Sequence, residues 1–468
     1  MISRARSQDF KEKVKKHNKL QDNYSPGNSG EFKLFVSTCY IKPWIKRIML
    51  KSHLLLAVAA FPLLVWPQSI FPTGTTIYDP DKAYSSYILL ADHTAYGNHP
   101  DPNMREANDD PPGDIRLIDM NGNIIHTWQV KPYFNKRCRL LPNGNLVYVG
   151  PEKTIYEYDW DGNVVWTHQG IGSMNDMRIL PNNNRLLIAH EPIPDELQKQ
   201  VKDVELAPWW PLRKRGTEET QLGADIYEIN LDGEIVWEWH AHHYIDVNLY
   251  SPATPEGDWL HGNSIAPLPE NKWFDNGDER FRPGNILFNA RNINTIFLID
   301  KVSKMIVWEG THTYKGGMAH SHEPEMIEKG LPGEGNIIFF DNGLFTRHRT
   351  HTGQSFIVEL NPITHDIEWL YETNGYANLK FFSKTMGTQK RLPNGNTYIA
   401  EDNTGRLFQV TPDGEIVWEY VNRGGTTRPT VVHYDFTPQL RALEKPIELK
   451  VSPMNNLEWH IKPDKYRK

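Results

Sequence analysis

Four histidines and two arginines lie close together in residues 316–351. His320 and His322 are separated by a single residue. Side chains alternate along an extended segment, so this spacing predicts that both imidazoles point to the same side of the chain. The run GNIIFFDNG further along predicts a strand that ends in a tight turn. The residues that could do chemistry after that turn are Arg347, His348 and His351.

These side-chain types suit the transfer of an anionic group. A planar guanidinium group can bind an oxyanion through two parallel hydrogen bonds. A neutral imidazole can attack the transferred group and form a covalent intermediate, which gives ping-pong kinetics. A second imidazole can take a proton from an acceptor near neutral pH. The stretch therefore predicts nucleophilic group transfer, provided that the fold brings these side chains together.

A repeated unit supplies the fold. An apolar and acidic strand, a turn, and a strand ending in tryptophan recur six times, and four of the six turns contain Asp-Gly or Asn-Gly. Such turns favour tight hairpins, and a second strand after a Pro-Asn-Gly type of turn precedes five of these hairpins. About four strands per repeat predict an all-β, six-bladed β-propeller, whereas a parallel β-helix has shorter repeats without hairpin turns. The repeated tryptophans are Trp128, Trp166, Trp237, Trp308, Trp369 and Trp418.

The first strand of each blade is expected to line the central channel, and here those strands directly precede the Pro-Asn-Gly turns. Their polar residues should converge near the axis. We expect the catalytic residues to be His261, His322, Arg347 and His320. We expect the substrate-binding residues to be Asn263, Asp176, Gln389, His348 and His351, with Asn175 nearby.

Each of these residues also has a purely structural interpretation. Polar channel residues can simply hydrogen-bond to one another and to water. Arg347, His348 and His351 could be ordinary surface-loop residues, and Glu323 could orient the imidazole beside it. A further cluster could bind a metal ion or could be solvated, and consists of His240, His242 and His243.

The connections between strands vary in length. Insertions at residues 191–222, 243–258 and 270–282 are expected to form loops over one face of the propeller. Their tyrosines and tryptophans could stack on an aromatic ring. The first repeat lacks its own Pro-Asn-Gly element, so blade one should either borrow a strand or be irregular. The tail from Thr430 onward is the candidate that closes the ring.

Charge and cysteine content exclude several classes. The 468-residue chain has a net charge of −7, although residues 1–51 are strongly basic, so the remaining body is distinctly acidic. An acidic body argues against nucleic acid as a partner. Cys39 and Cys138 are the only cysteines, which excludes a disulfide framework and a cysteine metal site.

The N-terminal part has a different character. Residues 1–48 are expected to be a basic disordered extension or a mis-assigned start, and residues 49–72 a signal peptide or membrane anchor. The apolar run Leu54–Trp66 follows basic residues and is shorter than a membrane-spanning helix. The protein is therefore expected to be exported to the periplasm or outside the cell, or anchored by this segment. The propeller is expected at residues 84–440, with a C-terminal tail at 441–468.

The sequence resembles the bacterial arylsulfate sulfotransferase family over roughly Asp114–Asn422. The resemblance rests on DWLHGNSI, on a histidine followed by a leucine-proline turn and GNIIFFDNG with an arginine nearby, and on the Asp-Gly-x-Ile-Val-Trp endings. It implies a six-bladed propeller that transfers a sulfuryl group from a phenolic sulfate ester to a phenol. It also implies a sulfated histidine and no requirement for PAPS, metal or another cofactor. His261 and His322 match family histidines, and Arg347 approximates the family arginine.

One difference from the family pattern leaves the identity of the nucleophilic histidine undecided. The family's sulfated histidine lies further toward the C-terminus, but no histidine occurs between His365 and His433. Either His322 or His261 takes that role, or the chain is a divergent member with different chemistry. One alternative is a metal-dependent lyase or hydrolase that uses His261, His320, His322 and Asp341. Another is a non-catalytic binding propeller whose histidines only fill the channel.

Overall fold

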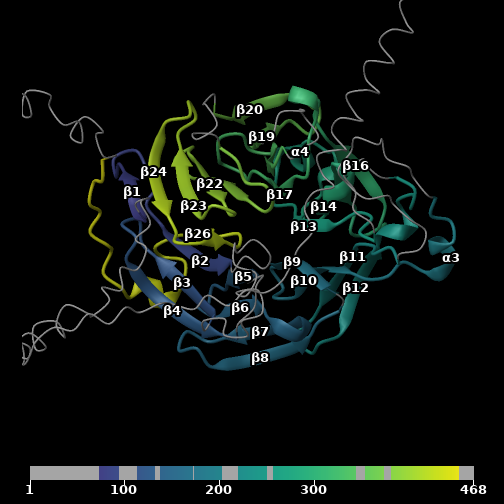
Figure 1. Cartoon of the computed structure of the whole chain (residues 1–468), viewed down its shortest axis with the longest axis horizontal. Helices are drawn as coiled ribbons and strands as arrows, with labels where there is room; N and C mark the ends of the chain where they lie inside the picture. Colours follow the sequence, from purple (N-terminus) through teal and green to yellow (C-terminus); the bar gives the residue numbers. More distant parts are fainter. Residues whose placement is uncertain are drawn as a thin grey trace, which may run out of the picture. The chain divides into compact units, whose positions relative to one another are not determined.

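The computed structural model describes residues 73–93, 113–131, 137–171, 173–202, 220–249, 257–343, 354–373 and 381–452 (Figure 1). The expected extension at 1–48 and the expected signal peptide or anchor at 49–72 lie outside these residues. Both therefore stay predictions. Within the described ranges, no helix is long and apolar enough to cross a membrane.

The described strands form six antiparallel sheets arranged as the blades of a propeller, which confirms the predicted all-β, six-bladed fold (Figure 1). Blade one contains β2 (Tyr87–His93), β3 (Gly113–Ile118) and β4 (Ile124–Val130). Blade two contains β5 (Arg137–Leu140), β6 (Leu146–Val149), β7 (Thr154–Tyr158) and β8 (Val164–Gln169). Blade three contains β9 (Ser173–Ile179), β10 (Arg185–His190), β11 (Asp225–Ile229) and β12 (Ile235–His240).

The other three blades follow the same plan. Blade four contains β13 (Gly262–Pro267), β14 (Ile286–Ala290), β15 (Thr295–Ile299) and β16 (Ile306–Gly310). Blade five contains β17 (His322–Met326), β18 (Ile337–Asp341), β19 (Phe356–Leu360) and β20 (Ile367–Tyr371). Blade six contains β21 (Thr388–Arg391), β22 (Thr397–Glu401), β23 (Arg406–Val410) and β24 (Ile416–Val421).

The repeated tryptophans join each blade to the next. Each indole Nε1 donates a hydrogen bond to a backbone carbonyl in the turn between the third and fourth strands of the following blade. The bonds run from Trp128 to Asp159 (3.0 Å), Trp166 to Leu231 (2.9 Å), Trp237 to Lys301 (2.9 Å), Trp308 to Pro362 (2.7 Å), Trp369 to Pro412 (2.7 Å) and Trp418 to Met120 (2.7 Å). The last bond returns to blade one, so this repeated contact completes the ring.

Both ends of the propeller chain take part in closure. β1 (Gly74–Tyr78) pairs with β24 as the outermost strand of blade six. β25 (Gly425–Thr426) and β26 (Thr430–Val432) pair with β2 and supply the missing inner strand of blade one. The borrowed strand predicted from Thr430 onward is therefore present. The expected boundary at residue 84 is corrected, because it leaves out β1.

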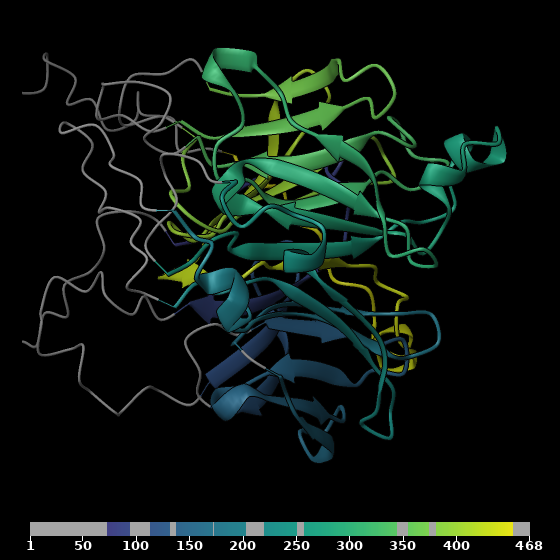
Figure 2. The same ribbon diagram turned by 90° about the vertical axis from the view of Figure 1, so that its right-hand side faces the viewer.

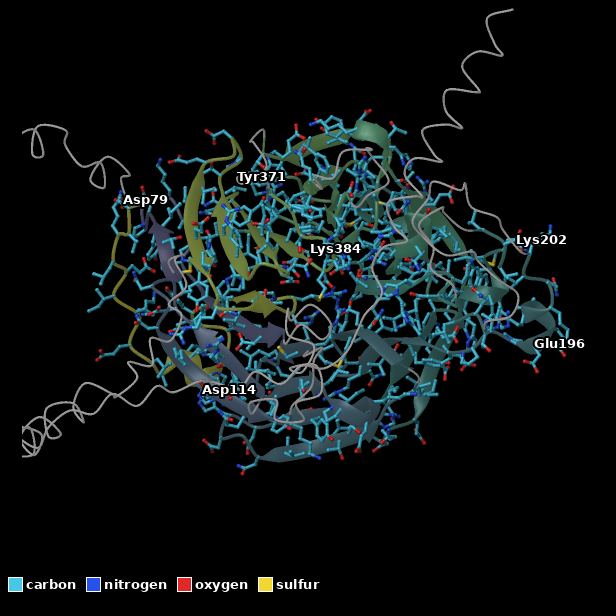
Figure 3. All side chains as sticks on the ribbon, viewed as in Figure 1. Asp79, Asp114, Glu196, Lys202, Tyr371 and Lys384 are labelled. Carbon is cyan, nitrogen blue, oxygen red and sulfur yellow. The ribbon has the colours of Figure 1, made fainter. Side chains whose placement is uncertain are left out.

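The first strands of blades two to six lie innermost, as predicted, since neighbouring first strands contact one another across the blade boundaries. In Figure 3, the labelled Lys384 precedes β21 and lies near the middle of the ring, whereas the labelled Glu196 and Lys202 lie at its periphery. Residues at the start of a first strand and at the end of its antiparallel second strand lie at the same end of the ring. We call this end the upper end.

The expectation that three insertions cover one face is wrong in one case. Residues 191–222 and 243–258 connect strand ends at the upper end, with α3 (Asp195–Gln198) and η3 (Ala241–His243) in them or beside them. Residues 270–282 instead join the lower ends of β13 and β14, and form α4 (Lys272–Asp275) and η4 (Glu279–Phe281). These two short helices project from one side of the ring in Figure 2. The remaining short helices are η2 (Pro151–Lys153), η5 (Arg291–Ile293), η6 (Tyr314–Gly316) and α5 (Pro438–Arg441).

Arg428 lies between β25 and β26 and ties the closing strand to the far side of the axis. It is 2% exposed, its Nη1 pairs with Glu323, and its Nη2 donates to the carbonyl and side-chain oxygens of Asn263 at 2.9 and 2.8 Å. Burial of a guanidinium group is tolerated here because carboxylate and carbonyl oxygens surround it. This residue was not singled out from the sequence.

We expect Arg428→Met to lower the free energy of unfolding by about 1–3 kcal/mol, because the buried oxygens of Asn263 lose their donor, whereas Glu323 keeps Arg178 as a partner. Arg282→Met is the control, since that side chain is 48% exposed and pairs with Glu279 at the surface. The control should change stability by about 1 kcal/mol or less. Chemical unfolding measures both values, and equal losses in the two variants would contradict the role of Arg428 as a closing contact.

Candidate functional site

Several polar residues gather at the upper end of blades three, four and five. They lie where an inner strand begins or where its neighbouring strand ends. These residues are His190 at the end of β10, Asp258 and His261 before β13, Arg291 after β14, and His320 and His322 at the entry to β17. The fold thus brings together side chains that are distant along the chain.

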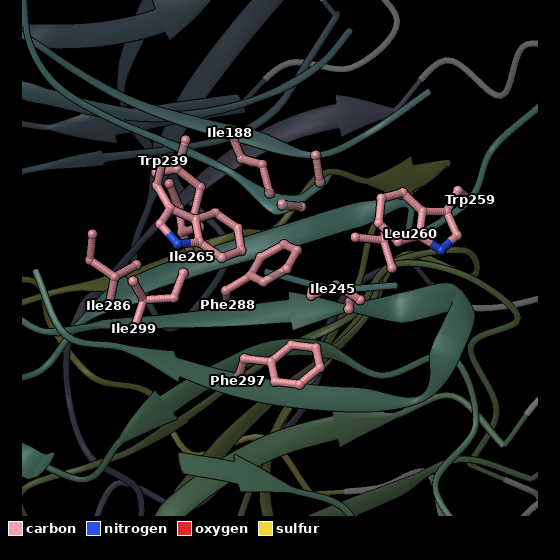
Figure 4. Close-up of a cluster of buried hydrophobic side chains, with 14 of the residues drawn as sticks. Ile188, Trp239, Ile245, Trp259, Leu260, Ile265, Ile286, Phe288, Phe297 and Ile299 are labelled. Atoms are coloured by element: carbon pink, nitrogen blue, oxygen red, sulfur yellow. The ribbon is translucent and has the colours of Figure 1, made fainter. Parts of the chain in front are cut away.

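The segment that carries His261 is fixed by the core behind it. Trp259 and Leu260 are fully buried in the hydrophobic cluster between blades three and four (Figure 4). Gly262 packs so closely that an added Cβ would lie 2.5 Å from the Cβ of Ala224. The backbone of this segment therefore has little freedom to move, which holds the His261 side chain in place.

Asp258 and His261 form a carboxylate–imidazole pair. The Nδ1 atom of His261 lies 2.5 Å from Oδ2 of Asp258, and the His261 side chain is 30% exposed. A carboxylate accepts hydrogen bonds, so Nδ1 carries the proton and Nε2 keeps its lone pair. Burial lowers the pKa of His261 to about 4 despite the opposing effect of Asp258, so the ring is neutral near pH 7.

Arg291 provides the positive charge of the site. Its Nη1 donates to Oδ1 of Asn292 at 3.0 Å, whereas its buried Nε has no hydrogen-bond partner. Among the described residues, the ion pairs include none between Arg291 and a carboxylate. Its charge contributes to lowering the pKa values of His261, His320 and His322. The next residue, Asn292, donates to the backbone carbonyl of Asp258 at 2.7 Å, so this segment lies beside the one that carries His261. The charge of Asp258 acts on Arg291, but the two are not joined by an ion pair, so the guanidinium group can still contact an anionic ligand.

His320 does not lie in an extended segment, which corrects the reason given for its orientation. Its φ is +57°, and β17 begins only at His322. It is 4% exposed, and neither ring nitrogen has a hydrogen-bond partner among the described residues. Burial, followed by the charge of Arg291, lowers its pKa well below the usual value. His320 is therefore a neutral imidazole whose nitrogens are free to contact a ligand.

His322 is held on both sides by the protein. Its Nδ1 atom lies 2.5 Å from Oδ1 of Asn342, and its Nε2 accepts a hydrogen bond from the backbone N–H of Met386 at 3.1 Å. Burial lowers its pKa well below the usual value. Because both nitrogens are occupied, His322 is better suited to joining blades five and six than to nucleophilic attack.

Three expected substrate-binding residues make contacts within the protein. Asp176 accepts from the backbone N–H of Ile265 at 3.1 Å and from Arg139 at 3.3 Å. Asn263 accepts from Arg428, and Gln389 donates to the backbone carbonyls of Glu323 (2.5 Å) and Ile338 (3.2 Å). These bonds favour the structural interpretation of the three residues. Asn175 likewise donates to the carbonyl of Gly262 at 3.3 Å.

The remaining candidates lie elsewhere. Arg347, His348 and His351 fall outside the described residues, so their predicted roles stay predictions. His240, His242 and His243 form a separate cluster on blade three, where Nδ1 of His240 lies 3.3 Å from Oδ1 of Asp225. Burial lowers the pKa of His242 to about 4 and raises that of Asp225 to about 6.

Sequence reasoning missed Arg291, Asp258 and His190. Two signals could have indicated them. Arg291 follows the strand in PGNILFNAR just as the Asp-Asn-Gly turn follows GNIIFF one blade later, and Asp258 precedes His261 within the DWLH motif. His190 likewise ends the second strand of blade three.

The buried histidines should make stability depend on pH. The folded-state pKa values of His320 and His322 lie below the value of 6.5 that unfolded chains have, so only the unfolded state takes up protons between these values. Stability should therefore fall as the pH drops below about 6.5, with each histidine contributing about 1.4 kcal/mol per pH unit. We expect His320→Asn, which stays neutral and tolerates positive φ, to lose one histidine's share of this slope in unfolding experiments from pH 7.5 to 5. An unchanged slope would contradict the prediction.

Comparisons with known proteins agree with the predicted resemblance. Residues 211–423 match the family described as Arylsulfotransferase (ASST), and this range contains His261, Arg291, His320 and His322. The match supports membership of the arylsulfotransferase family. No curated protein matches it significantly.

Similar solved structures include a protein of unknown function from Bacteroides caccae, with a TM-score of 0.43, 14% identity, and coverage of 75% of this chain and 99% of that chain. Another is virginiamycin B lyase from Staphylococcus aureus, solved with selenomethionine, with a TM-score of 0.37, 12% identity, and coverage of 75% and 85%. BamB from Moraxella catarrhalis has a TM-score of 0.32, 12% identity, and coverage of 69% and 74%. The propeller assignment rests on the strand pairing described above.

Proposed function

We propose that this protein transfers a sulfuryl group from a phenolic sulfate ester to a phenol, through a sulfated histidine and without PAPS or metal. The observation that carries the proposal is the arrangement of Arg291 beside neutral imidazoles, one of which is anchored by Asp258 and keeps a free Nε2. The match of residues 211–423 to the arylsulfotransferase family supports it. The anion clamp in this proposal is Arg291 rather than Arg347.

In the first half-reaction, the Nε2 lone pair of His261 attacks sulfur. The bond between sulfur and the phenolic oxygen breaks, and the phenolate leaves with the electron pair. Asp258 stabilises the positive charge that develops on the imidazole, and Arg291 holds the sulfuryl oxygens. Asp258 is a positioning residue, since it acts through His261.

In the second half-reaction, a phenol acceptor gives its proton to neutral His320. Its oxygen attacks the same sulfur, the sulfur–nitrogen bond breaks, and the electron pair returns to Nε2. His320 then passes this proton to the departed phenolate, which is the stronger base, and returns to its neutral form. Both steps conserve charge and leave the protein unchanged.

The transfer assay combines p-nitrophenyl sulfate with phenol. We expect release of p-nitrophenolate together with phenyl sulfate, and almost no release without an acceptor phenol. Absence of phenyl sulfate from the folded wild-type protein with several aryl donors would contradict the proposal.

The pH profile should be displaced toward acid. Only neutral His261 can attack, and its pKa is lowered to about 4, so the acid limb of kcat/KM should fall near that pH rather than near 6.5. Activity should accordingly be retained between pH 7 and 5. Rates measured at short times with buffers of constant ionic strength give the profile, and a limb near 6.5 would contradict the assignment of His261.

The metal-dependent alternative is less well supported by the site. Asp341, which that alternative needs, accepts from His312 Nε2 at 2.8 Å and from the backbone N–H groups of Ala319 and Gly343 at 3.0 Å. Its oxygens are therefore committed to holding the turn after β18. The metal hypothesis with His261, His320, His322 and Asp341 lacks an available carboxylate.

Export of the protein remains part of the proposal. It is supported by the apolar run Leu54–Trp66 after basic residues. N-terminal sequencing of the protein from the periplasm or medium should find a start after this run if it is a cleaved signal. Retention of Met1 on protein from the cytoplasm would contradict export.

A further inference from the structure

Four arginine side chains meet in the central channel, although they come from separate parts of the chain. They share two carboxylates, one on β9 and one on β17, and we call these six side chains the arginine cluster. Its members are Arg137 and Arg139 on β5, Asp176 and Arg178 on β9, Glu323 on β17, and Arg428 between β25 and β26. Because β5, β9 and β17 are inner strands, the cluster lies near the axis of the propeller.

All four guanidinium groups lie close to the same carboxylates. The nitrogen–oxygen distances to Asp176 are 3.3 Å from Arg139, 3.4 Å from Arg178, 3.4 Å from Arg428 and 3.7 Å from Arg137. Glu323 pairs with Arg178 at 2.5 Å and with Arg428, whereas Arg137 stays 3.8 Å away. Two negative charges thus serve four positive charges at these distances.

Arg137 has the weakest contacts of the four arginines. Its distances to both carboxylates exceed the length of a hydrogen bond. Its Nε and Nη1 atoms are buried and have no hydrogen-bond partner among the described residues, and the residue is 5% exposed. The buried Nε of Arg428 likewise has no partner within those ranges. Buried N–H groups of a cation are costly without an acceptor, so a further anion beside Arg137 would be stabilised.

Repulsion between the guanidinium groups adds to this cost. Burial lowers the pKa of Arg137 and of Arg139 to about 10, and neighbouring arginines contribute to both shifts. Asp402 also acts on Arg137, but its carboxylate already accepts hydrogen bonds from Thr426 Oγ1 at 2.8 Å and from the backbone N–H of Gly387 at 2.9 Å. The carboxylates of the channel therefore leave Arg137 without a direct partner.

Solvent reaches the cluster from one side. The side chains of Arg139 and Arg178 are 14% and 18% exposed, whereas those of Arg137 and Arg428 are 5% and 1% exposed. An anion must therefore pass the first two arginines to reach the buried N–H groups. A monatomic anion needs the least room for this and accepts hydrogen bonds from any direction, which favours a halide over a larger oxyanion.

We propose that the arginine cluster binds one halide ion, chloride under ordinary conditions, beside Nε of Arg137. The ion accepts a hydrogen bond from a buried N–H group that has no other acceptor. Its charge also reduces the repulsion between arginines of blade two, blade three and the closing segment, so it stabilises the closed ring. This inference does not depend on sulfuryl transfer, because the cluster contains none of the residues assigned to that reaction.

The melting temperature of the full chain tests the proposal when sodium chloride replaces sodium gluconate at constant ionic strength. We expect a saturable rise of about 2 °C or more for the wild type. Arg137→Met and Arg137→Gln should fold, because Asp176 keeps three arginines, and should lose this rise. Arg282→Met, which removes a surface ion pair, is the control and should keep it. Arg291→Gln should also keep it, which distinguishes the cluster from the candidate active site.

Bromide locates the ion, because it gives an anomalous X-ray signal in soaked crystals. The peak should lie against Nε of Arg137 in the wild type and be absent from Arg137→Met. No chloride-dependent rise in the wild type would overturn the proposal and leave water as the occupant. An undiminished rise in both Arg137 variants, or its loss in Arg291→Gln, would place the anion elsewhere and also overturn it. A rise that depends on Arg137 but occurs only with sulfate would overturn the assignment to a halide.

Discussion

Replacing His261 with alanine should lower kcat/KM for sulfuryl transfer by about 10⁴-fold or more, because it removes the atom to which the group is transferred. Alanine is uncharged, like the neutral imidazole that it replaces, so the net charge of the site does not change. Because Arg291 is still present to hold the donor, binding of the donor should change less than kcat. Steady-state kinetics with p-nitrophenyl sulfate and phenol measure both parameters.

Two further variants make this test specific. Asp258→Asn keeps the shape of the side chain but no longer stabilises the charged imidazole, so it should lower kcat substantially while the protein still binds the donor. His365→Ala removes a histidine on the turn before β20 and should behave like the wild type. Near-normal activity of His261→Ala would move the nucleophile to His320 or His322.

Replacing Arg291 with glutamine should lower kcat by about 10²–10³-fold, because the sulfuryl oxygens lose the cation that stabilises them as the bonds change. Lysine at this position should restore only part of the activity, since an ammonium group cannot make the bidentate contact of a guanidinium group. The buried environment around Arg291 makes the electrostatic effect larger than it would be in water.

Arg282→Gln serves as the control for Arg291→Gln. It removes an arginine from the same blade, but one whose side chain is 48% exposed and pairs with Glu279. We expect unchanged kinetics from this control. Wild-type kcat in Arg291→Gln would show that another cation holds the sulfuryl group, and Arg347 would then be the next candidate.

The repeats were sufficient to predict the propeller because their signal is local. Each Asp-Gly or Asn-Gly turn fixes a hairpin within a few residues, and each terminal tryptophan marks the same strand in every blade. The role of the indole Nε1 could not be predicted, since its acceptor lies in the following blade. The same reason hides β1, which pairs with β24 at the opposite end of the chain.

The candidate site was predictable in part. His261 and His320 were expected near the axis because they precede inner strands, and in the structure the charge of Arg291 helps to lower the pKa of both. The positive φ of His320 and the occupied nitrogens of His322 depend on contacts with other blades, which no local pattern encodes. Arg291 was missed because a single arginine after a strand is common.

The role of Arg428 was likewise not predictable from the local sequence. Arg428 lies just before the tail that was expected to close the ring at Thr430, and it contacts Asn263 and Glu323 from blades four and five. Such contacts form only when the ring closes. The channel residues Asp176 and Gln389 also have structural partners in other blades. Asp176, for example, pairs with Arg428 of the closing segment.

Mass spectrometry of the protein quenched after mixing with an aryl sulfate, without acceptor, tests the central claim most directly. We expect a mass increase of one SO₃ group on the peptide that contains His261, lost again on addition of phenol and absent from His261→Ala. An SO₃ adduct on another residue that disappears at the catalytic rate, or transfer without any adduct, would contradict His261 as the sulfated nucleophile.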